Sequence, residues 1–357
     1  MALWADKYQP KALDKFVLNK GISDNLKKLV ATGDCPHTLF YGPPGAGKRT
    51  LVMALLREIY GPGAEKIRVE TKPWVLELPS RKLELELTTV SSNYHVELSP
   101  GDVGGTNDRY VVQEVIKDLA KNRPLDVATG HKGFKVLVLN EVDRLSREAQ
   151  QSLRRTMEKY SAGCRLVMDP VRSRCLCVRV AAPSNDVVQE QLFAVAKKEG
   201  LQLPAPLAAR IAASSLRDLR RALLTLEVCR VQQYPFREDQ AVAPADWEAY
   251  VAEVAGDILQ EQSAKRLYQA RCSLLGHQVR GKLYELLANC IPPELLLRAL
   301  LLELLKKLDD EIKPDVAALA AQYEHRLQEG QKAIFHLEAF VAQFMSRYKN
   351  WQLTAFG

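Results

Sequence analysis

A glycine-rich segment with a single lysine, YGPPGAGKRT at residues 41–50, has the residue types and spacing that suit phosphate chemistry. It lies between the apolar run HTLFY and the helix-like run KRTLVMALLREIYG. Glycines let backbone N–H groups converge on phosphate oxygens, and the N-terminus of the following helix adds a partial positive charge. The segment therefore predicts a phosphate-binding loop, with a structural glycine turn as the alternative. The candidate nucleotide-binding residues of this loop are Gly42, Pro43, Pro44, Gly45, Ala46, Gly47, Lys48, Arg49 and Thr50.

Arg49 departs from the pattern of loops that hydrolyse nucleotides. The residue after the lysine is ordinarily a Ser or Thr whose hydroxyl holds Mg²⁺. Thr50 comes one position later, which is a rotation of about 100° around a helix, so it replaces that hydroxyl only if the loop is re-set. We therefore expect ATP or ADP to bind through Lys48, and the sequence leaves a role for Mg²⁺ open.

An apolar run, VLVLNEVDRL at residues 136–145, ends in a second candidate site. In ATPases with such a loop, this strand ends in two carboxylates, of which the first supports Mg²⁺ and the second polarises the attacking water. Here the neutral Asn140 takes the first position, Glu141 keeps the second, and Asp143 follows. An Asn side chain adds no charge to a metal site. Changes at both metal-side positions indicate a site that has lost catalysis, and ordinary surface acids at a strand end are the alternative.

Length and composition are typical of a globular protein with two or three domains. The chain has 357 residues, 47% of them apolar and 26% charged, and its apolar stretches are shorter than the roughly 18 residues of a membrane helix. The N-terminus lacks the apolar core of a secretory signal. Seven scattered cysteines form no zinc-ligand set and predict reduced thiols. The net charge of +7 favours polyanionic partners.

The order of segments predicts the domain organisation. Strand-like and helix-like segments alternate up to about residue 182, which predicts a parallel sheet covered by helices. Within this part, RKLELELTTV and YHVELSP predict an antiparallel excursion. From residue 183 onward helix-like segments follow one another, and YPFREDQAVAPADW separates two groups of them. We therefore place domain boundaries near 182 and near 253.

Six further stretches, which occur in order along the chain, narrow the family. LWADKYQPKALDKFVLNK, SLRRTMEKYS, RSRC and LRDLRRALLTLE resemble sequence boxes of the small subunits of replication factor C, the eukaryotic sliding-clamp loader. SNYHVEL and GQKAIFHLEAFVAQFMSRYK resemble the small subunit at the end of that loader. The resemblance covers nearly the whole chain.

This resemblance implies an AAA+ fold with an α/β RecA-like domain at 1–182, a helical lid at 183–252 and an all-α collar at 253–357. The collar would join five replication factor C subunits into a heteropentamer. The resemblance also implies a nuclear protein of DNA replication and repair. It would help to load the ring-shaped PCNA clamp onto primer-template DNA, without a membrane partner.

The resemblance also implies roles for individual residues outside the loop. Arg174 of RSRC is similar to an arginine finger that enters the ATP site of the neighbouring subunit, and a surface arginine beside Cys175 is the alternative. Arg220 is similar to the lid arginine that senses the subunit's own nucleotide, and a helix-surface charge is the alternative. Tyr8 and Pro10 resemble residues that flank the adenine, and an N-terminal anchor is the alternative.

DNA contacts follow from the same resemblance. Related loaders follow duplex phosphates with the N-termini of two helices, which correspond here to a helix beginning near residues 107–109 and to SREAQQSLRR. For Arg154 and Arg155, packing against the adjacent subunit is the alternative. The apolar C-terminal helices are expected to pack either the collar or an internal core.

Two segments depart from the family pattern. In CRLVMDPVRSRC only residues 167–170 fill the place of a longer strand and sensor loop, so the position of Arg174 depends on a shortened lead-in. A segment around residues 272–279 is inserted into a collar helix. Both are either gene-model errors at exon borders or real variation.

Three functions are compared. The leading one is a clamp-loader subunit that holds a nucleotide with little or no hydrolysis of its own and supplies Arg174 to its neighbour. The second is an active AAA+ ATPase subunit of the same loader or of a related checkpoint loader, with Glu141 in its acidic motif. The third, a P-loop kinase or an unrelated nucleotide switch, fails to explain RSRC, DLRR and the helical C-terminus.

Overall fold

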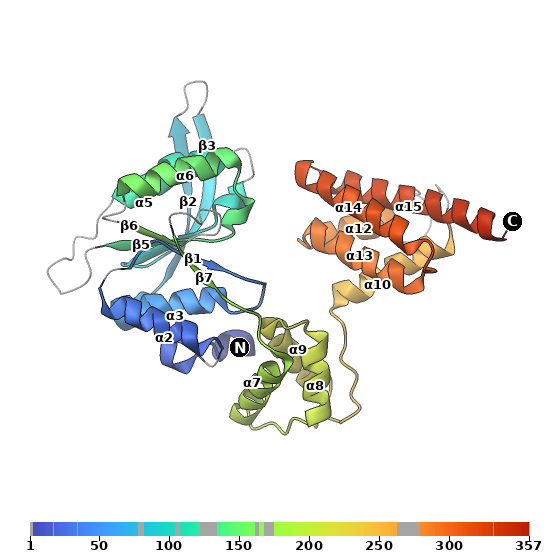
Figure 1. The fold of residues 1–357 in the computed structure, drawn as a ribbon, viewed down its shortest axis with the longest axis horizontal. Coiled ribbons are helices and arrows are strands. Elements are labelled where there is room, and N and C mark those ends of the chain that lie inside the picture. The colour runs from blue at the N-terminus through green and yellow to red at the C-terminus, as the bar shows by residue number, and fades with distance from the viewer. Residues whose placement is uncertain are drawn as a thin grey trace. The chain divides into compact units, whose positions relative to one another are not determined.

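The computed structural model describes most of the chain as two compact units, Met1–Val242 and Ala243–Gly357 (Figure 1). The described residues are 3–16, 18–33, 35–77, 82–103, 108–121, 134–160, 164–167, 175–262, 279–330 and 332–356. Each unit has hydrophobic cores of its own.

A mixed sheet forms the centre of the first unit. Over the described residues it has seven strands in the order β2-β3-β4-β5-β6-β1-β7. Neighbouring strands from β4 to β7 along this order run parallel, whereas β2, β3 and β4 are antiparallel. The predicted parallel sheet and its antiparallel excursion are therefore confirmed. The strands are β1 (Thr38–Tyr41), β2 (Arg68–Glu77), β3 (Lys82–Ser91), β4 (His95–Leu98), β5 (Lys135–Leu139), β6 (Cys164–Val167) and β7 (Leu176–Arg179).

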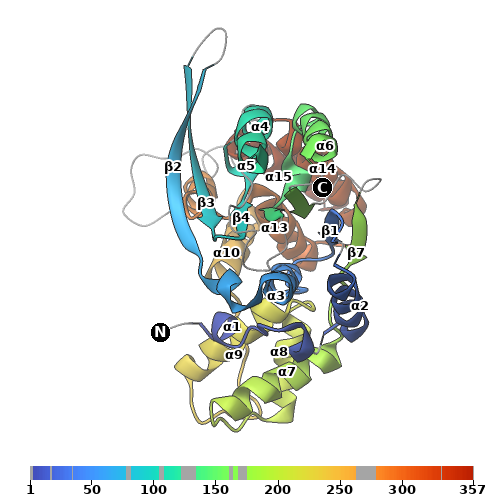
Figure 2. The same ribbon diagram turned by 90° about the vertical axis from the view of Figure 1, so that its left-hand side faces the viewer.

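Helices cover both faces of this sheet (Figure 2). Successive side chains of a strand point to opposite faces, so Leu137 and Leu139 of β5 pack in one core and Val136 and Val138 in another. This burial on both faces explains why β5 is continuously apolar. On one side lie α2 (Lys20–Ala31) and α3 (Lys48–Tyr60), preceded by η1 (Leu13–Lys15) and followed by η2 (Gly61–Glu65). On the other side lie η3 (Pro100–Val103), α4 (Asp108–Tyr110), the π-helical η4 (Val111–Ile116), α5 (Lys117–Lys121), η6 (Val142–Arg144) and α6 (Arg147–Tyr160).

Three helices after the sheet form the helical end of the first unit. They are α7 (Asn185–Lys198), α8 (Ala205–Ser214) and α9 (Leu219–Gln232), and the N-terminal α1 (Trp4–Lys7) packs beside α9 (Figure 2). Ser184 caps α7 by accepting a hydrogen bond from the Val187 amide, and Asp218 caps α9 by accepting one from the Arg221 amide. The side chain of Trp4 is buried in the core of these helices. The N-terminal segment is thereby anchored on this helical part.

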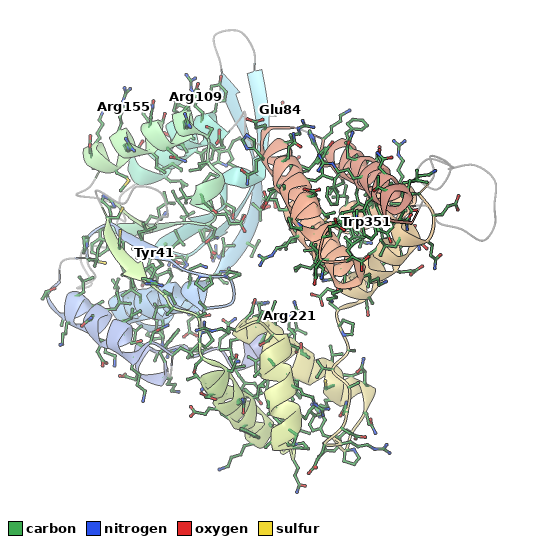
Figure 3. The ribbon with its side chains drawn as sticks, turned by 45° about the vertical axis from the view of Figure 1, so that its right-hand side comes forward. Tyr41, Glu84, Arg109, Arg155, Arg221 and Trp351 are labelled. Atoms are coloured by element: carbon green, nitrogen blue, oxygen red, sulfur yellow. The ribbon has the colours of Figure 1, made fainter. Side chains whose placement is uncertain are left out.

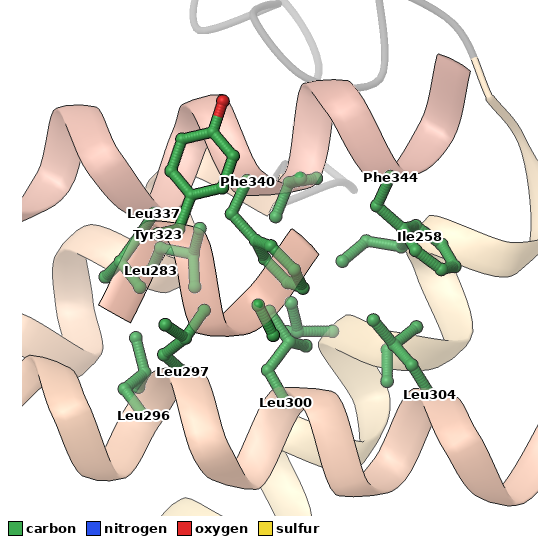
Figure 4. Packing of buried hydrophobic residues seen from close by; sticks show 14 of the residues in the cluster. Ile258, Leu283, Leu296, Leu297, Leu300, Leu304, Tyr323, Leu337, Phe340 and Phe344 are labelled. Carbon is green, nitrogen blue, oxygen red and sulfur yellow. The ribbon is translucent and has the colours of Figure 1, made fainter. Parts of the chain in front are cut away.

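Over its described residues the second unit is all-α, as predicted. It contains α10 (Asp246–Gln260), α12 (Val279–Ala288), α13 (Pro293–Lys307), α14 (Lys313–Glu329) and α15 (Ala333–Phe356). Leu300, Phe340 and Phe344 are among the side chains of its core (Figure 4). Helix α10 runs through the boundary expected near 253, because Val251 and Val254 on its apolar face pack in this same core. The division of the first unit near 182 stays a prediction.

Ion pairs around a buried lysine join two helices of the second unit. The Lys282 ammonium of α12 lies 2.6 Å from a Glu253 carboxylate oxygen and 2.7 Å from an Asp257 carboxylate oxygen, both on α10. Although burial opposes its charge, the hydrogen bonds that Lys282 donates to these carboxylates raise its pKa. Among the described helices, none is both long and apolar enough to cross a membrane.

Substitutions of two leucines on α13 test how much core packing contributes to the stability of the second unit. Leu300 is 1% exposed and Leu302 is 51% exposed. Leu300→Ala leaves a cavity and is expected to lower the free energy of unfolding by about 2–5 kcal/mol. Leu302→Ala is the matched control and should change it by less than about 0.5 kcal/mol. Urea denaturation of the full chain, combined with amide exchange in α13 to α15, measures both, and equal effects would contradict this packing.

Candidate nucleotide site

The glycine-rich loop connects the carboxyl end of β1 to the first turn of α3, as predicted. The strand ends at Tyr41 and the helix begins at Lys48. Gly42 and Gly45 have positive φ angles of 154° and 69°. A Cβ atom on Gly42 would lie 2.1 Å from the Val180 carbonyl oxygen after β7. The loop therefore needs glycine both for its backbone conformation and for its close contact with the neighbouring strand.

The side chains of the loop separate into a buried base and an exposed surface. Ala46 is buried in the core beside α3, whereas Pro43 and Pro44 are exposed. The Lys48 ammonium donates hydrogen bonds to the carbonyl oxygens of Gly42, at 2.6 Å, and of Pro43, at 2.9 Å. Thr50 is half-buried on the first turn of α3. The loop thus brings the lysine amine back over its own backbone, at the N-terminus of a helix.

Arg49 forms a bidentate ion pair with Glu97 on β4. Its Nε lies 2.9 Å from Glu97 Oε1, and its Nη2 donates a hydrogen bond to Glu97 Oε2 at 3.1 Å. The Glu97 side chain is 5% exposed and that of Arg49 is 67% exposed. Two parallel charge-assisted hydrogen bonds fix both the orientation of the guanidinium and its distance from the carboxylate.

Asn140 contacts the same carboxylate. Its Nδ2 donates a hydrogen bond to Glu97 Oε1 at 2.8 Å, and its backbone N–H donates to the Leu98 carbonyl oxygen at 3.1 Å. The parallel pairing of β4 with β5 places the two residues at the same edge of the sheet. Glu141 follows, exposed, with a positive φ of 50° at the start of η6. The two departures from the hydrolytic pattern, Arg49 and Asn140, therefore meet on Glu97.

Sequence reasoning missed Glu97. The signal in the sequence was an acidic residue inside the short strand HVEL, all four of whose residues are buried. A buried carboxylate needs a counter-charge or several hydrogen-bond donors, so its presence predicts a basic partner. The identity of that partner depends on strand pairing, which the sequence alone does not give.

The side chains at this edge do not fit Mg²⁺. Mg²⁺ prefers an octahedral set of oxygen ligands, often one or two carboxylates together with phosphates and waters. Here a guanidinium stands where the hydroxyl ligand would be, Asn140 is neutral, and both Glu97 oxygens are engaged by Arg49 or Asn140. Among the residues that the structure describes, no group of three or more His, Cys, Asp and Glu side chains is arranged to hold a metal ion.

The helical end of the first unit contacts the loop through Asp218. A Cβ atom on Gly45 would lie 2.0 Å from Asp218 Oδ1, so the carboxylate packs directly against the loop backbone. Arg220, two residues further along α9, has a side chain that is 57% exposed, and its Nη2 lies 3.4 Å from Asp6 Oδ1 of α1. The N-terminus of α9 is therefore held at the loop, with the candidate lid arginine paired to the N-terminal segment.

Tyr8 and Pro10 belong to this N-terminal segment. The Tyr8 hydroxyl donates a hydrogen bond to Glu199 at the end of α7, and the Lys7 ammonium lies 2.6 Å from the same carboxylate. These hydrogen bonds lower the pKa of Glu199. Pro10 is half-buried. The anchoring of the segment on α7 and α9 is observed, while contact of Tyr8 and Pro10 with an adenine stays a prediction.

A buried carboxylate ties together the two helices for which we predict DNA contacts. Asp108, the first residue of α4, is 1% exposed. Its Oδ2 accepts a hydrogen bond from the Ser146 amide at 2.6 Å, and its Oδ1 accepts one from the Ser146 hydroxyl at 3.0 Å. The same hydroxyl accepts a hydrogen bond from the Ala149 amide, so Ser146 caps α6. The N-termini of α4 and α6 therefore lie side by side.

Two family models and several relatives match this chain. Residues 247–352 match the model described as replication factor C subunit 3, C-terminal domain, and residues 191–231 match the RCF1/5-like, AAA+ ATPase lid domain. Replication factor C subunit 3 of Arabidopsis thaliana is 59% identical over 99% of this chain and 100% of its own length. Replication factor C subunit 3 of Homo sapiens is 49% identical over 98% of this chain and 97% of its own. This chain belongs to the replication factor C subunit family.

Membership in the replication factor C family confirms the resemblance found in the sequence and the AAA+ fold expected from it. The lid model coincides with part of α7 and with α8 and α9. Among solved structures, a RuvB Holliday junction branch migration motor of Thermotoga maritima aligns with 71% of this chain and 80% of its own. Its identity of 17% and TM-score of 0.46 add nothing to the family assignment.

Arg174, the candidate finger of this replication factor C subunit, lies outside the described residues. So do residues 168–173, in which the family pattern is shortened, and residues 272–278 of the collar insertion. The described chain resumes at Cys175, and burial raises the pKa of its thiol to about 11. A raised pKa favours the protonated thiol, and Cys175 forms no disulfide in the described part of the chain.

Gly45→Ala tests the contact between the loop and the helical end. The new Cβ would meet the Asp218 carboxylate in a backbone conformation that alanine rarely adopts. We expect the variant to lower the free energy of unfolding by about 1–3 kcal/mol. Gly21→Ala on α2 is the control, since its Cβ meets no atom within 4 Å. Thermal denaturation measures both, and equal melting temperatures for the two variants would contradict the contact.

Proposed function

We propose that this replication factor C subunit binds ATP or ADP in its glycine-rich loop and hydrolyses it little or not at all. The observation that carries this proposal is the joint engagement of Glu97 by Arg49 and Asn140. Both residues stand where a hydrolytic site needs metal-supporting groups. The loop keeps its glycines, its lysine and its place before a helix, which are the features that bind phosphates.

We further propose that the subunit supplies Arg174 to the ATP site of its neighbour. An arginine in trans stabilises the charge that develops on the transferred phosphoryl group. A subunit that contributes such a group keeps a role in the loader's ATP cycle even when its own site is inactive. The position of Arg174 in RSRC supports this role, and the shortened segment before it makes the role worth testing directly.

The proposed partners are the other replication factor C subunits, the PCNA clamp and primer-template DNA, in the nucleus. The human and plant relatives are named as subunits of replication factor C, which implies an assembly of several chains. The match of residues 247–352 to the family's C-terminal domain supports assembly through the second unit. Exposed leucines on α13, Leu295 and Leu302, leave apolar surface available for such packing.

Contact with the DNA backbone is proposed for the paired N-termini of α4 and α6. Helix N-termini favour phosphate, and Asp108 holds these two together. Figure 3 shows Arg109 and Arg155 extending outward from the same edge of the first unit. Arg109 also pairs with Glu148 at 2.7 Å across the two helices, which orients its side chain. Such contacts are independent of base sequence and weaken with salt.

Two substitutions separate the inactive subunit from an active ATPase. The experiment uses a reconstituted loader in which two ATP sites are left unaltered, that of the neighbouring subunit and that of this chain. All other sites are inactivated by substitution of their loop lysines. Arg174→Ala should lower DNA-stimulated, single-turnover hydrolysis by roughly a thousandfold. Lys48→Ala should lower it by less than about twofold, because the subunit's own site contributes little turnover. The reverse result would favour the active ATPase with Glu141 in a catalytic role.

The salt dependence of DNA binding tests the proposed interface. Arg155→Ala in the assembled loader removes one phosphate contact, so the slope of log affinity against log salt should fall by about 1. Arg237→Ala is the matched control, because Arg237 is an exposed arginine beyond α9, away from the two helices. An unchanged slope for Arg155→Ala would assign this arginine to packing against another subunit.

A further inference from the structure

The buried Glu97 carboxylate needs a counter-charge, and Arg49 provides it. The Glu97 side chain is 5% exposed, and a buried carboxylate without a counter-charge is strongly destabilising. Arg49 provides a full positive charge through two hydrogen bonds, and Asn140 donates a third. The three side chains form a compact unit, called here the Arg49–Glu97–Asn140 cluster, whose net charge is zero.

The same edge would be charged differently in a metal-dependent site. With a hydroxyl at position 49 and an Asp at position 140, Glu97 and that Asp would bring two negative charges, which a divalent cation would balance. Within the cluster of this chain Glu97 is the one carboxylate, and the Arg49 guanidinium balances its charge. A divalent cation entering the cluster would have to displace Arg49, and it would gain a single carboxylate in return.

The Arg49 guanidinium also has N–H donors that Glu97 does not use. Arginine carries five N–H donors in a fixed fork, and Nε and Nη2 use only some of them on Glu97. The Arg49 side chain is 67% exposed and directly follows Lys48 at the N-terminus of α3. Arg49 therefore keeps N–H donors that Glu97 does not use, beside the lysine and the helix N-terminus that a phosphate would contact, and arginine matches phosphate geometry well.

We propose that the loop binds the metal-free form of a nucleoside diphosphate or triphosphate, with the Arg49–Glu97–Asn140 cluster in place of Mg²⁺. Lys48 and Arg49 supply positive charge to the phosphates, and Glu97 holds Arg49 in position. This inference rests on the proposed binding of ATP or ADP and adds that the binding needs no divalent cation.

The test compares nucleotide affinity with Mg²⁺ and with EDTA. The full-length chain is titrated with a fluorescent ADP analogue, and anisotropy gives the dissociation constant under each condition. For the unaltered chain, removal of Mg²⁺ should change this constant by less than about threefold. In Arg49→Thr with Asn140→Asp, which restores the metal-supporting residue types, removal of Mg²⁺ should weaken binding by about tenfold or more.

Matched controls separate the cluster from a general effect of charge. Arg57→Thr removes a guanidinium from the other end of α3, where it pairs with Glu65, and should leave binding independent of Mg²⁺. Circular dichroism checks that each variant folds. If the double variant does not fold, the comparison for the unaltered chain still tests whether nucleotide binding needs a divalent cation.

The outcomes are distinct for the two proposals. If the unaltered chain binds nucleotide neither with Mg²⁺ nor with EDTA, the proposed function fails. If it binds with Mg²⁺ and loses about tenfold or more in affinity in EDTA, nucleotide binding stands and the metal-free inference is overturned. If a folded double variant is as independent of Mg²⁺ as the unaltered chain, the cluster is not the cause and the inference is overturned as well.

Discussion

The ion pair between Glu97 and Arg49 is the constraint on which the chemistry of the first unit depends. Glu97 is buried at the carboxyl edge of the sheet, where β1, β4 and β5 all end, and the Arg49 guanidinium is fixed beside it as its counter-charge. Asn140 completes its hydrogen bonds. The loop, the strand end and the first turn of α3 are thereby linked through one carboxylate. Arg49 and Asn140, at the two positions that usually support a metal ion, both bind this carboxylate.

The rest of the first unit positions this edge. Gly42 lets the loop approach Val180, the residue after β7, Asp218 brings the N-terminus of α9 against Gly45, and Asp108 joins the N-termini of α4 and α6. Each of these contacts joins segments far apart in the sequence. Under the proposed function the nucleotide lies at this loop, which Asp218 connects to the N-terminus of α9. Its state would then bear on the helices for which we propose contact with DNA.

Local patterns were enough to predict the loop, the strands β1 and β5 and helix α3. In each, the residue types and the spacing of apolar side chains lie within one short segment. Glu97 could not be predicted as a partner, because it meets Arg49 and Asn140 only through the pairing of β4 with β5. The boundary near 253 falls within α10 for a similar reason, since composition does not reveal which core an apolar helix joins. The role of Arg174 and contact of Tyr8 and Pro10 with adenine stay predictions.

A structure of the assembled loader, prepared with nucleotide and Mn²⁺, tests the central claim most directly, because anomalous scattering from manganese marks each divalent cation. We predict that the loop of this chain contains nucleotide without an anomalous peak, and that Arg49 remains paired with Glu97. A manganese peak between the phosphates and Glu97, with the Arg49 side chain displaced into solvent, would contradict a site in which the guanidinium replaces the metal.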